Sequence, residues 1–490
     1  MNQTGRTIVK NASVLLISQV STWGLSLVIM IFMTRYLGAT GIGQIHLANS
    51  IWAILAITIE FGMNTYLTKE ISRSPERIDN LLSVSLILRS LLYVGSIFVL
   101  LLYLQFTDYA PVTIAVIFVT GISNLVIQFG MVYRASLEGL ERMEYISVAQ
   151  IVARIFTAVV TIALLLLNYG LIAIVSVGIF ESLINVAIQY TAVRRLRRPK
   201  FYFNWAAAKE MLQKSYPYLI VYIFLVMYMQ VDIIVISLLV NETGVGWYGA
   251  ADQLFGTLLF LPSIFMTAVF PVLSRMYANA SDSLPRLMSK SFNLLLLVSV
   301  PVGLGVLVIA DPLVVLLFGE EFIKSGPILA VMGIVIILTY QNMLLGQFFI
   351  SIDRQKDWTW VMAAATAATI ALDLVLIPWC ERVFGNGAIG GSIAFVITEA
   401  GMLFVALRML PDGIITWQSS RRSSRAILAG IGMVAATWWA RDLFIAIPIA
   451  LGVVSYSALI LLLRVVPPED WDLLKTIGVS FMKRVRKQPA

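Results

Sequence analysis

Apolar residues in this chain gather into long runs that are separated by short polar segments. A helix needs about 20 apolar residues to cross the hydrocarbon core of a bilayer. The pattern predicts about 14 spanning helices by this measure, near residues 12–34, 42–66, 80–104, 110–133, 146–167, 171–193, 214–240, 248–274, 287–310, 326–350, 358–379, 388–410, 425–440 and 443–464. The short alternating segments of a β-barrel are not the pattern, so we predict an all-α polytopic membrane protein.

Composition supports this class. Of the 490 residues, 59% are apolar and 13% charged, and the mean hydropathy is +0.88. Soluble domains are about 45–50% apolar and about 25% charged, so a soluble enzyme, a nucleic-acid-binding domain and a disordered chain are excluded. A single cysteine, Cys380, and a single histidine, His46, exclude an internal disulfide framework and a cysteine or multi-histidine metal cluster.

The basic residues of the loops predict the orientation. With the N-terminus inside, inner segments carry 29 of the 35 Lys and Arg residues, whereas outer loops carry only Arg35, Lys324, Arg382 and Arg441. Cytoplasmic loops of membrane proteins are enriched in Lys and Arg. We therefore expect both termini in the cytoplasm, with the chain crossing the membrane many times; the family resemblance described below implies the cytoplasmic (inner) membrane of a bacterium or archaeon.

The longest polar run, 194–213, is basic and lies midway along the chain. It predicts an N-lobe at 1–193 with six spans, a cytoplasmic linker at 194–213, a C-lobe at 214–410 with six spans, and two further spans with a basic tail at 411–490. No extramembrane segment is long enough to fold as a catalytic domain, so an enzyme is not expected.

Two short echoes indicate an internal repeat. The segment TGIG at 40–43 opens the second span and TGVG at 243–246 opens the eighth, 203 residues and six spans later. Glu141-Arg142 and Asp353-Arg354 also stand six spans apart. Because six is even, the halves would be parallel repeats with a substrate path between them; the alternative is that TG[IV]G is a common helix start.

Charged residues inside the predicted spans are costly and usually face a cavity or a partner. The first half holds Arg89, Arg154, Glu60 and Glu181, and helical spacing places polar residues beside them on spans 3 to 6, including Gln150, Asn124 and Gln128. One interpretation is a hydrated, substrate-binding cavity. The other is helix-to-helix hydrogen bonding, with Arg89 paired to Glu60 or Glu181.

The second half holds only acids at depth. Asp232 lies in span 7, and Thr369 and Asp373 share one face of span 11. Carboxylate and hydroxyl oxygens suit a hard cation such as Na⁺, or a proton. The alternative is that these acids are protonated and structural.

Five segments together resemble a known family, in order along residues 8–465. They are TRYLGATGIGQIHLANSIWAI at 34–54, ASLEGLERMEYISVAQIVARI at 135–155, GWYGAADQLFGTLLFLPSIFMTAVFPVLSRM at 246–276, FGEEFIKSGPIL at 318–329 and GAIGGSIAFVITEAG at 387–401. They resemble the polysaccharide-transporter branch, the Wzx-type oligosaccharide flippases, of the multidrug/oligosaccharidyl-lipid/polysaccharide (MOP) exporter superfamily.

The resemblance implies two six-helix lobes in a V shape plus two C-terminal helices. It implies a monomer that moves an undecaprenyl-diphosphate-linked glycan to the outer leaflet by alternating access. Membrane lipid and polysaccharide assembly proteins are the expected partners. No cofactor is expected beyond a coupling Na⁺ or H⁺. Related lipid II flippases use cavity arginines for the diphosphate, the role expected for Arg89 and Arg154. A Na⁺ site on the seventh and eleventh helices of some of these flippases resembles Asp232 with Thr369 and Asp373.

Other functions stay open at this point. A cation-coupled exporter of cationic drugs belongs to the same superfamily, but the arginines of the first half disfavour a cationic substrate. A membrane glycan polymerase would need a sizeable outer loop, and none is long enough.

Overall fold

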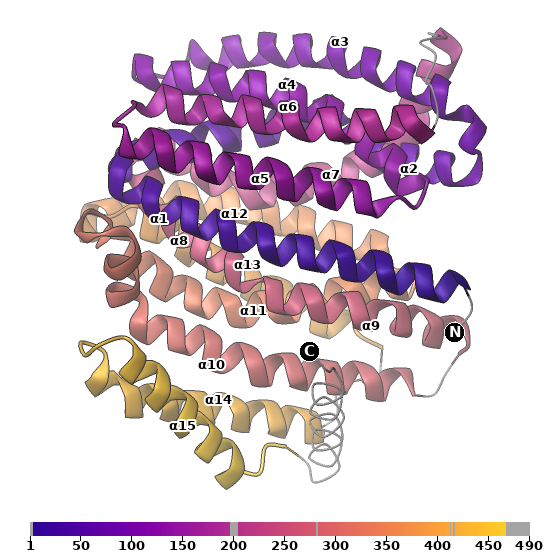
Figure 1. Ribbon diagram of the computed structural model, residues 1–490. Coiled ribbons are helices and arrows are strands. Elements are labelled where there is room, and N and C mark those ends of the chain that lie inside the picture. Colours follow the sequence, from indigo (N-terminus) through magenta and orange to yellow (C-terminus); the bar gives the residue numbers. More distant parts are fainter. Residues whose placement is uncertain (1–2, 197–203, 281–282, 412, 415–416, 467–490) are drawn as a thin grey trace, which may run out of the picture. The chain divides into compact units, whose positions relative to one another are not determined.

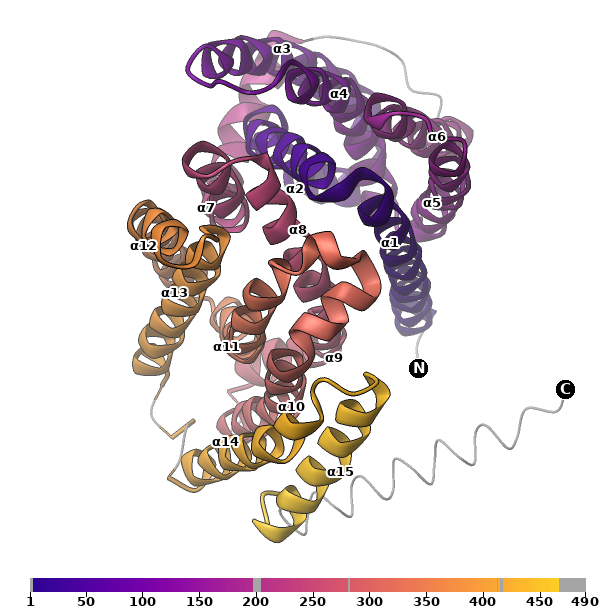
Figure 2. The same cartoon turned by 90° about the vertical axis from the view of Figure 1, so that its left-hand side faces the viewer.

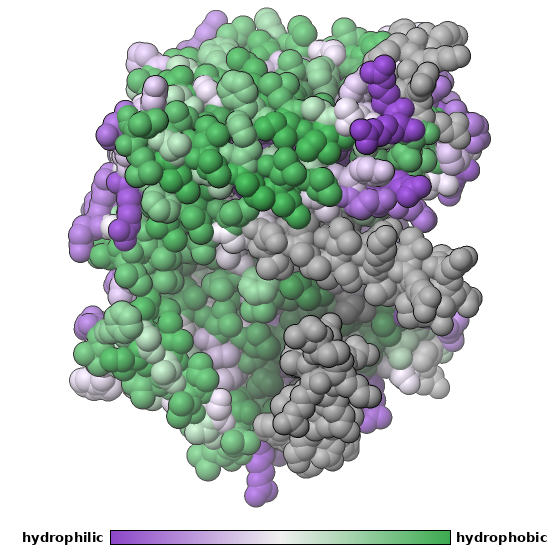
Figure 3. Space-filling view, viewed as in Figure 1, coloured by the Kyte–Doolittle hydropathy of each residue, from purple (hydrophilic) through white to green (hydrophobic). Residues whose placement is uncertain are grey.

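The computed structural model is helical throughout the part of the chain that it describes, residues 3–196, 204–280, 283–411, 413–414 and 417–466 (Figure 1). Eleven helical segments in that part are long and apolar enough to cross a membrane. In Figure 3 the surface over α4, α5 and α6 is mainly hydrophobic, and hydrophilic residues gather toward the helix ends. This is the distribution that a lipid-facing surface requires.

The longer helices follow the predicted spans in order. They are α1 (Gln3–Glu60), α2 (Met63–Arg73), α3 (Ile78–Leu104), α4 (Pro111–Gly139), α5 (Met143–Leu166), α6 (Leu171–Leu196), α7 (Trp205–Leu239), α8 (Glu242–Leu258), α9 (Phe260–Ala278), α10 (Leu284–Phe318), α11 (Ser325–Ser351), α12 (Gln355–Phe384), α13 (Ala388–Met409), α14 (Trp417–Thr437) and α15 (Ala446–Leu462). Short 3₁₀ turns lie at η1 (Pro75–Arg77), η2 (Glu320–Phe322) and η3 (Trp438–Ala440).

The helix boundaries differ from the predicted spans in four places, one of which is the break of the eighth span, 248–274, into α8 and α9. The first two spans form one helix, α1, which changes direction at Gly38, where φ is 66°. The predicted second span breaks at Phe61 and Gly62, both with positive φ, and continues as α2. The last two spans form α14 and α15, neither of which is among the eleven long apolar segments. The all-helical class is confirmed, but the number 14 is not.

Two prolines inside the spans leave a helix carbonyl without its usual backbone donor. A proline has no N–H to donate to the carbonyl four residues earlier. Pro262 thereby frees the Leu258 carbonyl at the break between α8 and α9, and the Tyr340 hydroxyl donates to that oxygen at 2.7 Å. Pro301 frees the Leu297 carbonyl, which accepts from the Tyr456 hydroxyl at 3.1 Å. In lipid, where no water is present, such replacement donors are what makes a broken helix tolerable.

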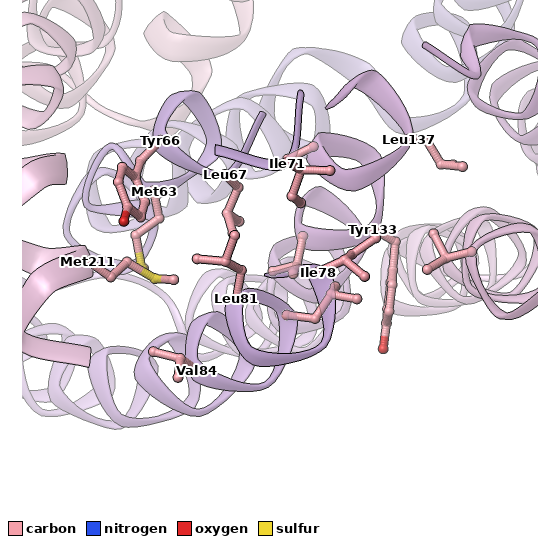
Figure 4. Packing of buried hydrophobic residues seen from close by; sticks show 14 of the residues in the cluster. Met63, Tyr66, Leu67, Ile71, Ile78, Leu81, Val84, Tyr133, Leu137 and Met211 are labelled. Carbon is pink, nitrogen blue, oxygen red and sulfur yellow. The ribbon is translucent and has the colours of Figure 1, made fainter. Parts of the chain in front are cut away.

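The described chain forms two compact units. The first comprises residues 1–257, 314–328 and 359–398, and the second comprises 258–313, 329–358 and 399–490. In the first unit α2 packs against the adjoining ends of α3, α4 and α7 (Figure 4), through Met63, Tyr66, Leu67, Ile71, Ile78, Leu81, Leu137 and Met211 among others. In the second, α10, α14 and α15 share a core that includes Val300, Met433 and Ile460.

The predicted lobes at 1–193 and 214–410 stay a prediction, as does the orientation in the membrane. Residues 197–203 of the linker and 467–490 of the basic tail lie outside the described residues.

The second echo of the repeat, Glu141-Arg142 and Asp353-Arg354, has a structural counterpart. Glu141 and Asp353 both have positive φ, and the residue after each donates its N–H five residues back, to Leu137 and Phe349, at 2.8 Å. Both turns are therefore the same helix C-terminal motif.

Candidate functional site

A cavity of about 560 Å³ lies among α1, α4, α5 and α6, which pack side by side as a ring of four helices (Figure 2). Its polar lining consists of side chains of three kinds, namely hydroxyls, amides and a few charges: Asn49, Thr120, Ser123, Asn124, Arg134, Gln150, Arg154, Thr157, Thr161, Glu181, Ser182, Asn185 and Gln189. Four of the residues that the sequence suggested for a substrate site line this cavity, namely Arg154, Glu181, Gln150 and Asn124, and their role stays a prediction.

Arg154 is the central charged group of this cavity. Its guanidinium donates to Glu181 on α6 at 3.2 Å and to the Ser26 hydroxyl on α1 at 2.6 Å and 3.1 Å. The Arg154 side chain is 30% exposed and the Glu181 side chain 29%. The ion pair therefore joins α5 to α6 and also lies on the cavity wall, and the partner of Glu181 is Arg154 and not Arg89. A partly exposed pair of this kind is weakly held and can exchange partners.

The sequence analysis did not single out Arg134, which lies near the cytoplasmic end predicted for its span. It lines the cavity and donates to Glu138 on its own helix at 2.9 Å. A signal was available, since Thr120, Asn124, Ile127, Met131 and Arg134 step by 4, 3, 4 and 3 along α4, and all five line the cavity.

Amide groups in the cavity keep free hydrogen-bonding capacity. Gln189 donates to the Asn185 carbonyl oxygen at 2.6 Å, and the Gln189 side-chain oxygen has no donor among the described residues. The same holds for the Asn124 side-chain oxygen. A buried acceptor without a donor is costly, so these two oxygens are unsatisfied acceptors on residues that line the cavity.

The structure places Arg89, Glu60 and Gln128 outside the residues that line this cavity. The Arg89 side chain is fully buried, and it donates to the Gln128 backbone carbonyl at 2.8 Å, to the Gln128 amide oxygen at 3.0 Å and to the Asn64 amide oxygen at 2.5 Å. Asn64 also hydrogen-bonds to Glu60. Arg89 therefore ties α3 to α4 and α2.

Two predicted acids come together in the first unit. The carboxyls of Asp232 on α7 and Asp373 on α12 adjoin one another, and both residues are buried, at 5% and 0% exposure. Asp232 accepts a hydrogen bond from the Tyr248 hydroxyl on α8 at 2.5 Å. Thr369 lies one turn before Asp373 and is buried, but its hydroxyl donates to the Ala365 carbonyl of its own helix at 3.0 Å.

This acid pair has spare ligand atoms. One oxygen of Asp232 and both oxygens of Asp373 lack a hydrogen-bond donor among the described residues. Within the same residues, three or more His, Cys, Asp or Glu side chains do not gather at any point in a way that could hold a metal ion. The sequence did not predict Tyr248, because a tyrosine in an apolar span is most often packing.

The sequence of this chain matches a known protein family. The sequence model described as "Polysaccharide biosynthesis protein" matches residues 8–277, more than half of the chain. The chain belongs to this polysaccharide biosynthesis family. A relative from Haloferax volcanii, Agl15, is described as a probable low-salt glycan biosynthesis flippase. It is 22% identical to this chain over 79% of this chain and 80% of its own length.

Solved structures show which known folds this chain resembles. It is similar to the lipid II flippase MurJ in an inward closed conformation, with a TM-score of 0.72 and 14% identity over 91% of this chain and 98% of MurJ. It is also similar to an inward-facing multidrug resistance transporter of the MATE family, with a TM-score of 0.63 and 15% identity over 83% and 95% of the two chains. The chain is a multi-pass membrane protein of the polysaccharide biosynthesis family, and it has the fold of these flippases and transporters.

Proposed function

We propose that this protein flips a lipid-linked oligosaccharide, carried on undecaprenyl diphosphate, across the cytoplasmic membrane by alternating access. The observation that carries the proposal is the cavity of about 560 Å³, because it places arginines beside many amides and hydroxyls within an apolar helix bundle. A transporter of apolar or cationic molecules has no use for such a lining. A diphosphate bearing a polyhydroxylated glycan requires both kinds of group.

The arginines and the uncharged polar groups of the cavity would bind different parts of the substrate. Arginine offers a planar fork that matches phosphate oxygens, and Arg154 and Arg134 are the arginines on the cavity wall. Each already has a carboxylate partner, Glu181 and Glu138. A diphosphate therefore competes with an acid for each arginine, which keeps its binding weak enough for release. The amide and hydroxyl side chains of the lining would hydrogen-bond to the glycan hydroxyls.

Purified protein in vesicles of phosphatidylethanolamine and phosphatidylglycerol tests this directly. We expect it to flip an undecaprenyl-diphosphate disaccharide with a fluorescent label, followed by loss of fluorescence when a membrane-impermeant quencher is added. The same label on phosphatidylethanolamine, which has no diphosphate or glycan, is the control and should not be flipped. Equal flipping of the two probes, or no flipping of the first, would contradict the proposal.

We also propose that Asp232 and Asp373 bind the coupling cation, Na⁺ or H⁺. Two adjoining carboxylates that are buried cannot both stay charged without a cation or a proton between them, and their free oxygens provide ligands of the type that Na⁺ takes. Binding would draw α7 and α12 together, and loss of the cation would let them part. The sequence suggested Asp232, Thr369 and Asp373 as ligands of this cation, and we add the Tyr248 hydroxyl.

Asp232→Asn and Asp373→Asn should each abolish the dependence of flipping on a Na⁺ or H⁺ gradient. An amide keeps the shape of the side chain and removes the charge that holds the cation. The measurement is the ratio of the flipping rate with a gradient to the rate without it. This ratio should fall to about 1 in the variants, because a cation that no longer binds one conformation more tightly than the other cannot drive the conformational change. Asp442→Asn is the control, since the Asp442 side chain is 86% exposed. A full gradient response in both variants would rule out this role.

A further inference from the structure

A buried carboxyl that takes no part in either proposed site lies in the second unit. Glu399 stands at the middle of α13, 11 residues from its start and 10 from its end, and it is 3% exposed. On α11, in the same unit, Thr339 and Asn342 are 8% and 3% exposed. An ionisable group at such depth in a membrane protein usually binds an ion or a polar partner. The contacts of these three residues indicate which of the two applies here.

The Asn342 amide contacts Glu399 through its nitrogen. This nitrogen donates to the Glu399 carboxylate at 2.6 Å and to the Glu399 backbone carbonyl at 2.8 Å. One positively polarised group thus lies between two oxygens, which is the kind of position that a cation takes. The Asn342 amide oxygen has no hydrogen-bond donor among the described residues. An amide that turns over would offer this oxygen as a third ligand at the same place.

The Thr339 hydroxyl is a further oxygen that the fold leaves unused. Thr339 lies three residues before Asn342, so the two side chains share one face of α11. The other buried threonines described in the second half donate to the carbonyl four residues earlier, at 2.8–3.0 Å: Thr366, Thr369, Thr398 and Thr437. The Thr339 hydroxyl has no partner among the described residues. A buried hydroxyl without a partner is costly, so it points to a ligand that the fold itself does not supply.

We infer that Glu399, Asn342 and Thr339 form a Na⁺ site between α11 and α13, which we call the α11–α13 site. Carboxylate, amide and hydroxyl oxygens are ligands of hard cations, and the Glu399 carboxylate supplies the charge that balances a monovalent ion. Coupling ions of transporters bind near the midplane of the membrane, which is where the middle of a span lies.

The α11–α13 site is independent of the acid pair. Asp232 and Asp373 belong to the first unit, whereas Glu399, Asn342 and Thr339 belong to the second. The simpler alternative is that the bond from Asn342 to Glu399 only holds two helices together. That alternative gives no role to the Thr339 hydroxyl, and this difference makes the two accounts separable by experiment.

The number of bound Na⁺ ions tests the inference without any substrate. Asp232→Asn with Asp373→Asn removes the charges of the acid pair. We expect this double variant, purified in detergent with choline chloride, to bind about one radioactive Na⁺ per molecule in equilibrium dialysis, because the Glu399 charge remains. Adding Glu399→Gln should abolish this binding, since glutamine keeps the shape of the side chain and an oxygen for Asn342 but not the charge.

Two outcomes of that experiment would overturn the inference: a double variant that binds no Na⁺, or a triple variant that binds as much as the double. Wild-type protein that binds a single Na⁺, lost in Glu399→Gln alone, would instead refute the role of the acid pair and leave the α11–α13 site standing. The proposed function and this inference can therefore fail separately.

Thr339→Val in the otherwise wild-type chain distinguishes a cation site from a structural contact. Valine has nearly the shape of threonine and lacks the hydroxyl, so we expect Na⁺ binding to weaken several-fold while thermal unfolding in choline chloride stays unchanged. Thr398→Val is the matched control, because Thr398 is also buried, adjoins Glu399 and donates to its own helix; its Na⁺ binding should equal that of wild type. Equal Na⁺ affinity in the two variants would show that Thr339 is no ligand and would overturn the site.

Discussion

Arg154→Ala is expected to lower the flipping rate of the undecaprenyl-diphosphate disaccharide about 10- to 100-fold while leaving the protein folded. Hydrogen bonds to charged groups contribute about 1.5–3 kcal/mol, and about 1.4 kcal/mol corresponds to a factor of ten. The fold should survive because the Arg154 side chain is 30% exposed, and its loss leaves Glu181 in contact with the cavity. The measurements are flipping in vesicles and thermal unfolding in detergent.

Two further variants sharpen this expectation. Arg154→Lys should restore part of the rate, because lysine keeps the charge and lacks the planar fork. Arg142→Ala is the matched control, since Arg142 is also on the first half but is 51% exposed and pairs only weakly with Glu144 at 3.4 Å. A normal flipping rate in Arg154→Ala would remove this arginine from the substrate site.

Arg89→Ala should behave in the opposite way and destabilise the fold by about 3–5 kcal/mol, the range for loss of one member of a buried charged network. The substitution leaves two oxygens of Gln128 and one of Asn64 without their donor and opens a cavity where a fully buried side chain stood. Thermal unfolding in detergent should show a lower melting temperature than for wild type or Arg142→Ala.

The same variants discriminate between the two roles of Arg89. Arg89→Lys should remain destabilised, because one ammonium group cannot serve three acceptors in the geometry of a guanidinium. A variant Arg89→Ala that unfolds like wild type but no longer flips the disaccharide would instead restore the substrate-binding role that the sequence suggested.

Helical spacing explains why the sequence could not separate Arg89 from Arg154. Both lie about eight residues inside the predicted spans on polar stripes. The period of a helix shows which residues share a face, but not what that face meets. The stripe Thr120, Asn124, Gln128 steps by 4 and 4, and eight residues at 100° each overshoot two turns by about 80°. Gln128 therefore turns toward Arg89 on α3, while Ile127 and Met131 continue the wall of the cavity.

Local chemistry along the chain determined the class of this protein. Runs of apolar residues are enough to predict membrane-spanning helices, because each helix satisfies its backbone within itself and needs no distant partner. The TG[IV]G echo and the acids Asp232 and Asp373 were visible for the same reason, since a motif or a buried charge can be read in place. These features were enough to predict the fold class, to suggest a repeat and to pick out the two acids.

Only the tertiary structure decided which groups meet. Several contacts join residues on different helices: the Tyr248 hydroxyl donates to Asp232, Arg35 donates to the end of α10, and Glu321 accepts from the Ala39 N–H. The position of Arg134 on the cavity wall likewise depends on the shape of a space that several helices share. Such contacts depend on how whole helices rotate and approach, which is set by packing summed over many side chains. No single motif carries that information, and for this reason the partners of each buried charge became known only from the folded chain.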